Sequence, residues 1–272
     1  MAEVEARPLR AARPRLLQQR RRTHRTLAVV TVTIAFWASL VLVLYVYLGY
    51  PIFIAAWARM RPRPIARDER RPLPGVSVVI AARDEAGRIG ARIDNLLSLD
   101  YPRDRLQLIV VSDGSTDRTL DVLARYSEAV QVVALPRCGK AAALNAGVAA
   151  ARHDVVAFAD ARQRFAPDAL RMLVRNFADE RLGAVSGELL LSSPVSTGEH
   201  TVGEGLGLYW RYEKWIRRNE SLAGSTVGAT GAIYAMRKSL WQELPAGTLL
   251  DDVLAPMRAV LRGKRVVFEP AA

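Results

Sequence analysis

One stretch of the chain, Leu108–Asp117, constrains the fold more than any other. Its sequence, LIVVSDGSTD, is an apolar run that leads directly into an acidic turn of Gly, Ser and Thr. A buried strand, such a turn and a helix form the unit of open α/β sheets, which hold ligands at the carboxyl ends of their strands. We expect Asp113 at such an end, Ser115 or Thr116 as the cap of the following helix, and Asp117 in its first turn. Turn chemistry without any function explains the same residues equally well.

The same alternation continues along the chain. We predict strands at 76–81, 107–112, 130–135, 154–159 and 183–191, with helices between them at 86–98, 117–127, 140–151 and 167–178. Alternating strands and helices favour a mostly parallel sheet that is covered by helices on both faces. The sequence therefore predicts an α/β fold.

A long run near the N-terminus lacks charged residues. No Asp, Glu, Lys or Arg occurs from Leu27 to Ala58, and about 20 apolar residues are enough to cross a bilayer. We predict a membrane-spanning helix from Leu27 to about Leu48, a break at Gly49-Tyr50-Pro51, and an apolar stretch to Met60. A cleaved signal peptide is disfavoured, because the run is too long and no small-residue cleavage site follows it.

The excess of basic residues is confined to one part of the chain. Residues 1–71 contain 14 of the 39 Lys and Arg residues and 4 of the 27 Asp and Glu residues, which leaves 25 basic and 23 acidic residues for the remainder. A nearly neutral domain behind a basic flank argues against a nucleic-acid partner. The single cysteine, Cys138, excludes an intrachain disulfide, and no Cys or His cluster has zinc-ligand spacing. Arginines lie on both sides of the apolar run, so charge does not predict its orientation.

Three further motifs accompany DGSTD. Ala81-Ala82-Arg83-Asp84-Glu85 ends the first strand, Gly139–Asn145 reads GKAAALN, and Val155–Arg162 reads VVAFADAR. In this order, within roughly 75–270, the four motifs resemble those of the family-two glycosyltransferases, which include cellulose, chitin and hyaluronan synthases. The resemblance implies a GT-A fold, which is a Rossmann-like mixed sheet with helices on both faces, and a nucleotide-sugar donor, with a UDP-linked sugar favoured.

The resemblance also implies a division of the chain and a location. We expect a basic arm at 1–26, a transmembrane segment at 27–58, an exposed Arg/Pro-rich linker at 59–74 and the GT-A domain at 75–272. Nucleotide-sugar chemistry implies the cell (inner) membrane with a cytoplasmic catalytic domain. Related synthases continue with a Gln-x-x-Arg-Trp motif and more membrane helices. We therefore expect an incomplete C-terminal part, as in a fragment, a truncated product or a protein completed by a partner subunit.

The resemblance assigns the nucleotide of the donor to three residues at neighbouring strand ends, Ala82, Glu85 and Asp113. Helix capping or solvation is the alternative role of the two carboxylates. Lys140 follows Gly139 at a predicted helix start, a position suited to phosphate charge. The Walker frame around it is missing, and alone this residue would be an ordinary surface lysine.

Asp160 is the sharpest part of the resemblance. The family usually carries Asp-x-Asp here and positions the donor diphosphate through Mg²⁺ or Mn²⁺, whereas this chain has Asp160-Ala161-Arg162. In one interpretation the metal binds through Asp160 while Arg162 is turned aside or held in an ion pair. In the other, Arg162 contacts the diphosphate directly, because guanidinium matches phosphate oxygens bidentately.

The acceptor side is expected from the second half of the chain. Leu250-Asp251-Asp252 resembles the family's Glu-Asp motif, with Asp252 as the catalytic base and Asp251 in place of the Glu. Helix capping is the alternative role of the pair. Thr230 and Gly231 lie in a Gly-rich segment whose small residues let a sugar approach the backbone. The mixed aromatic and basic segment 207–218 is either an amphipathic helix at a membrane surface or a core-packed helix with snorkelling cations.

Taken with the resemblance, these residues predict an inverting glycosyltransferase that acts on a polysaccharide or lipid-linked acceptor of the cell envelope. A membrane-tethered nucleotide-sugar-binding protein without activity, or an inactive fragment, is the main alternative. A dinucleotide-dependent oxidoreductase is disfavoured, because no Gly-x-Gly-x-x-Gly follows the strand Val76–Ile80.

Overall fold

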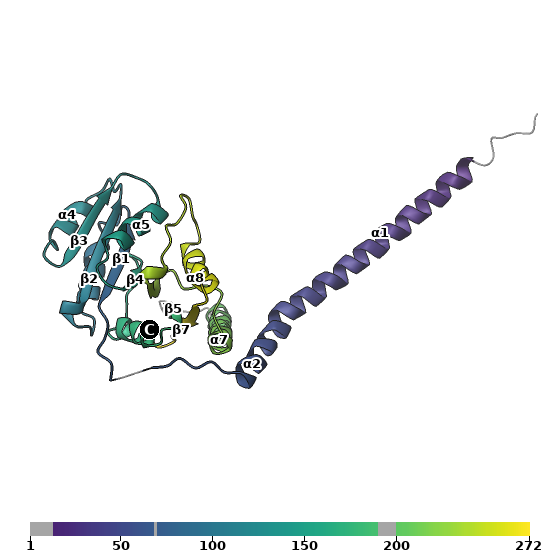
Figure 1. Ribbon diagram of the computed structural model, residues 1–272. Coiled ribbons are helices and arrows are strands. Elements are labelled where there is room, and N and C mark those ends of the chain that lie inside the picture. Colours follow the sequence, from purple (N-terminus) through teal and green to yellow (C-terminus); the bar gives the residue numbers. More distant parts are fainter. Residues whose placement is uncertain (1–12, 68–69, 190–199) are drawn as a thin grey trace, which may run out of the picture. The chain divides into compact units, whose positions relative to one another are not determined.

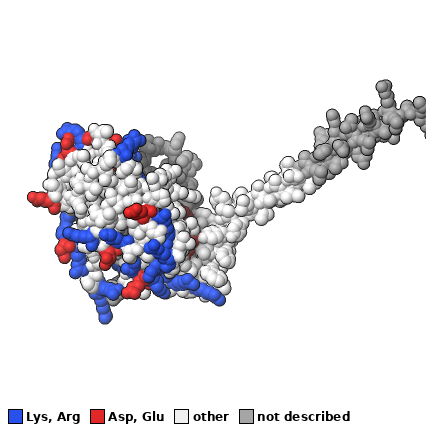
Figure 2. Space-filling view, turned by 45° about the horizontal axis from the view of Figure 1, so that its top comes forward, with Lys and Arg blue, Asp and Glu red and all other residues white. Residues whose placement is uncertain are grey.

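The computed structural model describes residues 13–67, 70–189 and 200–272. The chain forms two compact units, Met1–Phe53 and Ile54–Ala272. In the first unit, helix α1 (Arg13–Leu44) runs into a π-helical turn, η1 (Tyr45–Gly49), and then into α2 (Tyr50–Met60), which ends in the second unit. The apolar part of this continuous helix, Val29–Met60, is 32 residues long and has the length and composition needed to cross a membrane. Figure 2 shows this apolar part as white surface, in contrast to the mixed charges on the visible face of the second unit.

The predicted break at Gly49-Tyr50-Pro51 is wrong, because the chain stays helical through it. A proline ring normally clashes with the carbonyl four residues earlier and removes one helical hydrogen bond. Here the π turn adds one residue per turn, and the Tyr50 N–H donates to the Tyr45 carbonyl. The wider turn accommodates Pro51 as the second residue of α2.

The second unit is built on one seven-stranded sheet with the strand order β3-β2-β1-β4-β6-β5-β7 (Figure 1). Its strands are β1 (Val76–Ala82), β2 (Leu106–Asp113), β3 (Val130–Leu135), β4 (Val155–Ala159), β5 (Leu182–Ser186), β6 (Ile233–Arg237) and β7 (Arg265–Phe268). The first four are parallel, β6 runs antiparallel to both β4 and β5, and β7 is parallel to β5. This mixed sheet confirms the predicted α/β architecture. The predicted strand 183–191 ends at Ser186, and its last two residues lie outside the described ranges.

Among the described residues after the first strand, six helices follow or separate these strands. They are α3 (Ile89–Leu97), α4 (Thr119–Ala124), α5 (Lys140–Ala150), α6 (Ala169–Val174), α7 (His200–Ala223) and α8 (Asp251–Leu261). Short 3-10 turns occur at Arg103–Arg105, Arg175–Ala178 and Lys238–Leu240. The predicted helices between the first five strands are confirmed, with ends that are shorter by a few residues.

Two hydrophobic clusters hold the helices on opposite faces of the sheet. Alternate residues of β1 face opposite sides, so Val78 packs in a cluster with residues of α3, α4 and α6, whereas Val79 packs in a cluster with residues of α5 and α8. Helix α5 lies especially close to the sheet: a Cβ on Gly147 would lie 2.3 Å from Val79 Cγ1. This close approach fixes the start of α5, and with it Lys140, above the sheet edge.

Most described residues of the predicted exposed linker have exposed side chains, but Ile65 and Leu73 pack against the core and the segment is hydrogen-bonded to the domain. Arg63 N–H donates to the Leu222 carbonyl at 2.8 Å, Ala66 N–H donates to Asp179 Oδ2 at 3.1 Å, and Arg67 forms an ion pair with Glu269 at 2.6 Å. Asp179 and Glu269 are buried, and buried carboxylates need such donors. The segment 61–67 is therefore attached along the domain rather than free of it.

Helix α7 contains the mixed aromatic and basic segment 207–218. It packs against β7, and Ser221 near its end accepts the Phe268 N–H at 2.8 Å. Its other side is open, with Leu208, Tyr209 and Trp215 between 43% and 65% exposed. Packing on the domain and an exposed apolar side thus occur in the same helix.

Candidate active site

The parallel strands β1, β2 and β4 end at one edge of the sheet. Ala82 is the last residue of β1 and pairs with Ser112, one residue before Asp113 at the end of β2. Asp160 follows the last residue of β4. The structure therefore places these predicted donor-site residues on neighbouring strand ends, as parallel topology requires.

The loops after β1 and β2 are joined by Asp84. Asp84 has a backbone φ of +51°, a left-handed conformation that is uncommon outside glycine. Its Oδ1 accepts the Thr116 N–H at 2.7 Å, and its own N–H donates to Ser115 Oγ at 3.2 Å. The backbone N–H bonds from Thr116 are the largest influence on the Asp84 carboxyl and lower its pKa. Sequence reasoning missed this contact because the left-handed conformation leaves no signal in the sequence.

The predicted cap of the helix after β2 is wrong in its residue. Helix α4 begins at Thr119, and neither Ser115 nor Thr116 contacts its start; both contact Asp84 instead. Arg118 holds the cap position and makes no side-chain cap bond. Asp117, predicted in the first turn, lies before the helix, where its Oδ1 accepts the Thr119 N–H at 2.9 Å while its Oδ2 accepts the Ala86 N–H at 3.0 Å. The short acidic side chain thereby satisfies a free N–H at the helix start.

Asp113 is buried and holds the turn that precedes Lys140. Its Oδ1 accepts the N–H groups of Cys138 and Gly139 at 2.6 and 2.9 Å. Burial is the largest single influence and raises the pKa of this carboxyl, but the hydrogen bonds from Cys138 and Gly139, together with the charge of Arg83, lower the pKa overall. Gly139 needs its φ of +90° in this turn, and α5 begins at the next residue, Lys140.

Arg162 is held in an ion pair with Glu85. Its Nε lies 3.0 Å from Glu85 Oε1, and Arg88 lies 3.4 Å from Oε2 of the same carboxylate. The Glu85 side chain is 8% exposed, whereas that of Arg162 is 67% exposed. The ion pair agrees with the position of Arg162 in the first of the two predicted arrangements, whose metal at Asp160 stays a prediction. The main chain of Glu85 also starts α3, since its carbonyl accepts the N–H groups of Arg88 and Ile89.

Three carboxylates form a cluster at the end of β4 and the start of α8: Asp160, Asp251 and Asp252. Asp251, which is buried, pairs with Lys140 Nζ at 2.9 Å. Burial is the main cause that raises the pKa of Asp160; Lys140 opposes this shift, while the charges of Asp251 and Asp252 add to it. The carboxylate cluster is therefore a region of concentrated negative charge in a partly dry setting.

Asp252 lies against the Gly-rich segment. The Asp252 carbonyl accepts the Ala229 N–H at 2.9 Å, and a Cβ on Gly231 would lie only 2.8 Å from Asp252 Oδ2. Thr230 is fixed by Ser186 Oγ, which accepts the Thr230 N–H at 2.8 Å, and by Arg217, which donates to the Thr230 hydroxyl at 2.8 Å. Glycine at 231 thus leaves the carboxylate uncovered.

Asp252 also lines a cavity of about 230 Å³. Its wall includes side chains of α7 and of the segments that flank β5 and β6, namely Glu188, Trp210, Lys214, Arg217, Thr230 and Gly231. The charges of the wall are mostly paired within it: Lys214 lies 2.6 Å from Glu188, and Arg217 lies 2.6 Å from Glu213. The small cavity therefore offers two aromatic rings, those of Trp210 and Phe268, several hydrogen-bonding groups and the Asp252 carboxylate.

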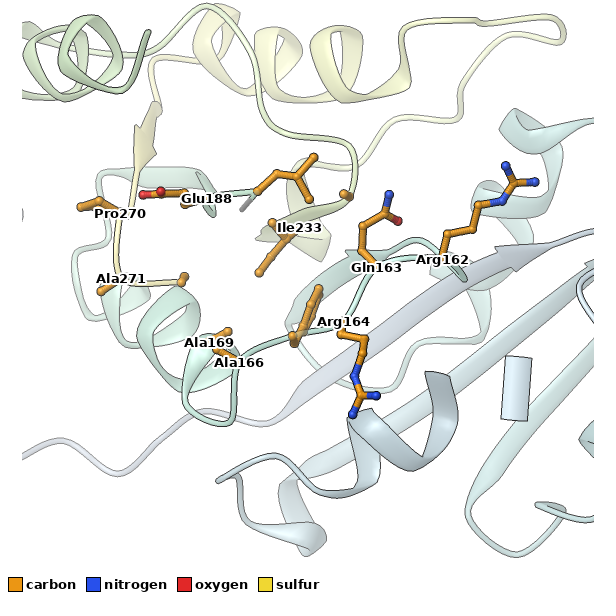
Figure 3. A pocket seen from close by; sticks show the side chains of 13 residues that line it. Arg162, Gln163, Arg164, Ala166, Ala169, Glu188, Ile233, Pro270 and Ala271 are labelled. Carbon is orange, nitrogen blue, oxygen red and sulfur yellow. The ribbon is translucent and has the colours of Figure 1, made fainter. Parts of the chain in front are cut away.

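A larger pocket of about 670 Å³ adjoins the small cavity through Glu188 and Leu189. Its lining includes Arg162–Ala166 from the loop after β4, together with Ile233 and Pro270 (Figure 3). In Figure 3 the side chain of Arg162 extends away from the Glu188 end of this pocket, consistent with its ion pair to Glu85.

Arg92 and Asn95 of α3 fix the loop after Asp160, and sequence reasoning missed both. Asn95 Oδ1 accepts the Phe165 N–H at 2.9 Å, and Asn95 Nδ2 donates to the Phe165 carbonyl at 3.0 Å. The Arg92 guanidinium lies 4.1 Å from the centre of the Phe165 ring and donates to Asn95 at 2.7 Å. Burial lowers the pKa of Arg92 to about 10. An arginine on an otherwise apolar helix face is the one signal that could have pointed to it.

A divalent cation fits this site only in a particular way. Within residues 13–67, 70–189 and 200–272, no group of three or more His, Cys, Asp or Glu side chains is arranged to hold a metal. Mg²⁺ and ions like it are commonly held by one or two carboxylates together with substrate phosphates and water. Asp160 supplies such a carboxylate, while Arg162 occupies the sequence position of the family's second one.

The comparisons with known proteins identify the family. The family model described as "Glycosyl transferase family 2" matches residues 77–244, and the chain belongs to this family. It is 30% identical over 226 residues to the probable glycosyltransferase YdaM of Bacillus subtilis (strain 168), covering 77% of this chain and 52% of that protein. It is 28% identical over 208 residues to the poly-beta-1,6-N-acetyl-D-glucosamine synthase of Staphylococcus aureus (strain MSSA476), covering 74% and 49%. The chain thus spans about half the length of these curated relatives.

Solved structures agree with the fold. The mannosyltransferase PcManGT of Pyrobaculum calidifontis, in complex with GDP-Man and Mn²⁺, superimposes with a TM-score of 0.69 at 27% identity, covering 85% of this chain and 65% of that one. S. aureus TarS 1–349 in complex with UDP-GlcNAc superimposes with a TM-score of 0.53 at 17% identity, covering 71% and 55%, and supports the fold alone. The predicted family and its GT-A fold are confirmed.

Proposed function

We propose that this chain is a glycosyltransferase that moves a sugar from a nucleotide-sugar, with a UDP-linked sugar favoured, to an acceptor hydroxyl with inversion at the anomeric carbon. One observation carries the proposal. Asp252 lines a cavity wide enough for part of an acceptor sugar and is electrostatically coupled to Asp160 at the end of β4. A candidate base and a candidate phosphate site are thereby adjacent.

On the donor side we assign the nucleotide to Ala82, Glu85 and Asp113. Asp113 Oδ2 accepts the Gly139 N–H at 3.1 Å, and a carboxylate oxygen can accept a further bond from a base or a ribose hydroxyl. Lys140 stands at the first turn of α5, where its charge and the free N–H groups of the helix favour a diphosphate. We assign Arg162 to the donor side as the residue that is paired with Glu85.

We assign a Mg²⁺ or Mn²⁺ ion to Asp160. Mn²⁺ accompanies GDP-Man in the similar mannosyltransferase structure, and the donor set at Asp160 suits a cation shared with a diphosphate. When bound, such an ion neutralises the charge that develops on the leaving diphosphate.

The reaction is a single displacement. The acceptor oxygen attacks the anomeric carbon and forms the new glycosidic bond, while the bond between that carbon and the diphosphate breaks. Asp252 accepts the acceptor's proton, and the nucleoside diphosphate leaves with the electron pair of the broken bond. Asp251 is the neighbour of the base in sequence and is paired with Lys140. It thereby connects the base with the lysine that we assign to the diphosphate.

We assign the small cavity beside Asp252 to the acceptor, with Thr230, Gly231 and Asp251 on that side. Its wall combines the ring of Trp210 with groups that are already paired, such as Lys214 with Glu188. An aromatic surface with paired polar groups favours a neutral sugar over an ionic ligand. The acceptor class that fits is a polysaccharide or a lipid-linked glycan, in line with the similarity to a poly-N-acetylglucosamine synthase.

We further propose that 27–58 anchors the protein in the cell membrane, with the domain 75–272 on the cytoplasmic side, where nucleotide-sugars occur. The length and uncharged composition of the helix support the anchor.

Turnover by the full chain in lipid nanodiscs tests the function. Release of UDP or GDP from nucleotide-sugars is measured with Mn²⁺ and with oligosaccharide acceptors, for wild type and for Asp252→Asn. Asp121→Asn is the matched control, because this side chain is 68% exposed on α4. Acceptor-dependent release in wild type and the control, but not in Asp252→Asn, supports the proposal. Saturable nucleotide binding without turnover would instead indicate a nucleotide-sugar-binding protein.

A further inference from the structure

Tyr234 of β6 places a hydroxyl group in the protein interior without a partner. The side chain is fully buried, and its hydroxyl oxygen has no hydrogen-bond partner in the described part of the chain. Its ring stacks on Phe158 with centroids 4.6 Å apart, and Phe158 stacks on Trp241 at 5.1 Å. A phenylalanine would make the same stack and avoid the loss of free energy that a buried, unpaired hydroxyl causes. Packing alone therefore does not explain a tyrosine here.

The surroundings of Tyr234 lead to the carboxylate cluster. Tyr234 belongs to the hydrophobic cluster between the sheet and helices α5 and α8. The first residues of these two helices are Lys140 and Asp251, and they form the 2.9 Å ion pair. Burial raises the pKa of Tyr234 well above its usual value, and Asp251 is the charged residue that affects it most. Tyr234 also pairs with Phe158 of β4, two residues before Asp160, and shares its cluster with Ala255 of α8, the helix that Asp251 begins. The unpaired hydroxyl therefore belongs to the same side of the sheet as Asp251, whose partner is a lysine.

Lys140 has two competing partners in the proposed reaction. Its side chain is 48% exposed and it stands where a diphosphate would bind. A lysine that turns toward a diphosphate leaves Asp251, which is only 3% exposed, with an uncompensated negative charge. A buried carboxylate without a donor is strongly unfavourable, so another donor has to replace the lysine.

We propose that Tyr234 is a positioning residue for Asp251: when a diphosphate draws Lys140 away, the Tyr234 hydroxyl donates to the Asp251 carboxylate and holds it beside Asp252. In the empty site the Tyr234 hydroxyl has no partner among the described residues, and Lys140 compensates the negative charge of Asp251. In the filled site Lys140 binds the diphosphate and Tyr234 compensates Asp251. This inference rests on the proposed function, since it takes the ligand of Lys140 to be a nucleoside diphosphate.

The test compares Tyr234→Phe with wild type in the full chain, by thermal unfolding without ligand and by calorimetric titration of UDP and of GDP with Mn²⁺. We expect an unfolding midpoint equal to or above that of wild type, because the variant loses an unpaired hydroxyl. We expect nucleotide affinity to fall by about tenfold, because a hydrogen bond to a charged group is lost in the bound state only. A purely structural hydroxyl would give the opposite pair of results, a lower midpoint with unchanged affinity, and would overturn the inference.

Tyr126→Phe is the matched control. The Tyr126 hydroxyl donates to Asp94 at 3.0 Å on the α3–α4 side of the domain, away from the carboxylate cluster. Its loss is expected to lower the midpoint slightly and to leave nucleotide affinity unchanged.

A second background separates this inference from the proposed function. In Lys140→Met, Asp251 has lost its lysine even without ligand, so Tyr234 is expected to donate to it already. Adding Tyr234→Phe to Lys140→Met is then expected to lower the midpoint and to change nucleotide affinity by no more than about twofold. If wild type binds neither UDP nor GDP, the proposed function fails. The inference is then still decided by stability, because Tyr234→Phe is expected to leave the midpoint equal or higher in wild type and to lower it in Lys140→Met. Equal effects of Tyr234→Phe on the unfolding midpoint in both backgrounds would overturn the inference. If Lys140→Met does not fold, the midpoint and nucleotide affinity of Tyr234→Phe in the wild-type background decide.

Discussion

In two regions of the same sheet edge, the pKa values of the carboxylates are shifted in opposite directions. After β1 and β2, Asp84, Asp113 and Asp117 accept backbone N–H groups of neighbouring loops, and the pKa of each is lowered. At the carboxylate cluster, burial raises the pKa of Asp160, and the Tyr234 hydroxyl has no hydrogen-bond partner among the residues that the structure describes. The first region is satisfied by backbone donors of its own chain, whereas in the second Asp251 is compensated by a lysine and burial disfavours the charge of Asp160. The difference teaches that the first region gains stability from its carboxylates and the second loses some, a loss that we attribute to its proposed role in binding ligands.

The largest effect is expected at the base. Asp252→Asn keeps the shape of the side chain but cannot accept the acceptor's proton, so turnover is expected to fall by about a thousandfold. Nucleotide affinity is expected to stay near that of wild type, because the residue lines the acceptor cavity. The measurement is steady-state release of nucleoside diphosphate alongside calorimetric affinity. Residual turnover within tenfold of wild type would remove Asp252 from the role of base.

Asp160→Asn sharpens the comparison, because it should improve stability while impairing binding. We expect affinity for UDP with Mn²⁺ to fall by about ten- to a hundredfold, since a charge-assisted contact is lost. The pKa of Asp160 is raised above its usual 3.8, so its ionised form destabilises the fold at neutral pH and this effect vanishes as the pH falls to 3.8. The variant should therefore unfold at higher temperature than wild type at pH 7, with the difference closing toward pH 4. A lower midpoint at pH 7 would contradict the contrast.

Asp113→Asn is the counterpart in the first region, and its effect has the opposite sign. An amide cannot accept the Cys138 and Gly139 N–H groups as strongly as a carboxylate, so stability at pH 7 is expected to fall by about 1–3 kcal/mol. The pKa of Asp113 is lowered. Its contribution is therefore present above pH 3.8 and is lost as the pH falls through the lowered value. Denaturant titrations of both proteins at pH 7 and pH 3 measure this change. Equal stability at pH 7 would show that the two loops are not held by this carboxylate.

The smallest effect is expected at Arg162. Its guanidinium is exposed and paired with Glu85, and such pairs contribute about 0–1 kcal/mol. Arg162→Ala should change UDP affinity by less than about threefold. Arg162→Asp restores the second carboxylate of the family motif and should increase the dependence of binding on Mn²⁺. A tenfold loss in Arg162→Ala would favour direct contact with the diphosphate, and an unchanged metal response in Arg162→Asp would argue against that contact.

The sequence predicts well what depends on local pattern. The apolar runs of β1 and β2 and the acidic turn after Val111 place Asp113 at a strand end, and Gly139 predicts the start of α5 at Lys140. The sheet's mixed character came only with the family resemblance. The periodicity of apolar residues indicates which side of an element is buried, but it carries no information on how distant strands pair.

What depends on distant contacts could not be predicted. The left-handed Asp84 is stabilised by a loop more than 30 residues away, and the Glu85–Arg162 pair joins residues 77 positions apart. Pro51 in a continuous helix depends on a π turn that no residue of Tyr45–Gly49 specifies by itself. The buried hydroxyl of Tyr234 looks, in sequence, like any apolar position of a strand.

Calorimetric titration of UDP and of GDP into the full chain, with and without Mn²⁺, for wild type and Asp160→Asn, tests the central claim most directly. We predict saturable binding of one nucleotide that tightens with Mn²⁺ in wild type and loses this dependence in Asp160→Asn. Binding that is identical in the two proteins, with or without the metal, would contradict the assignment of the carboxylate cluster as a site kept for its ligands.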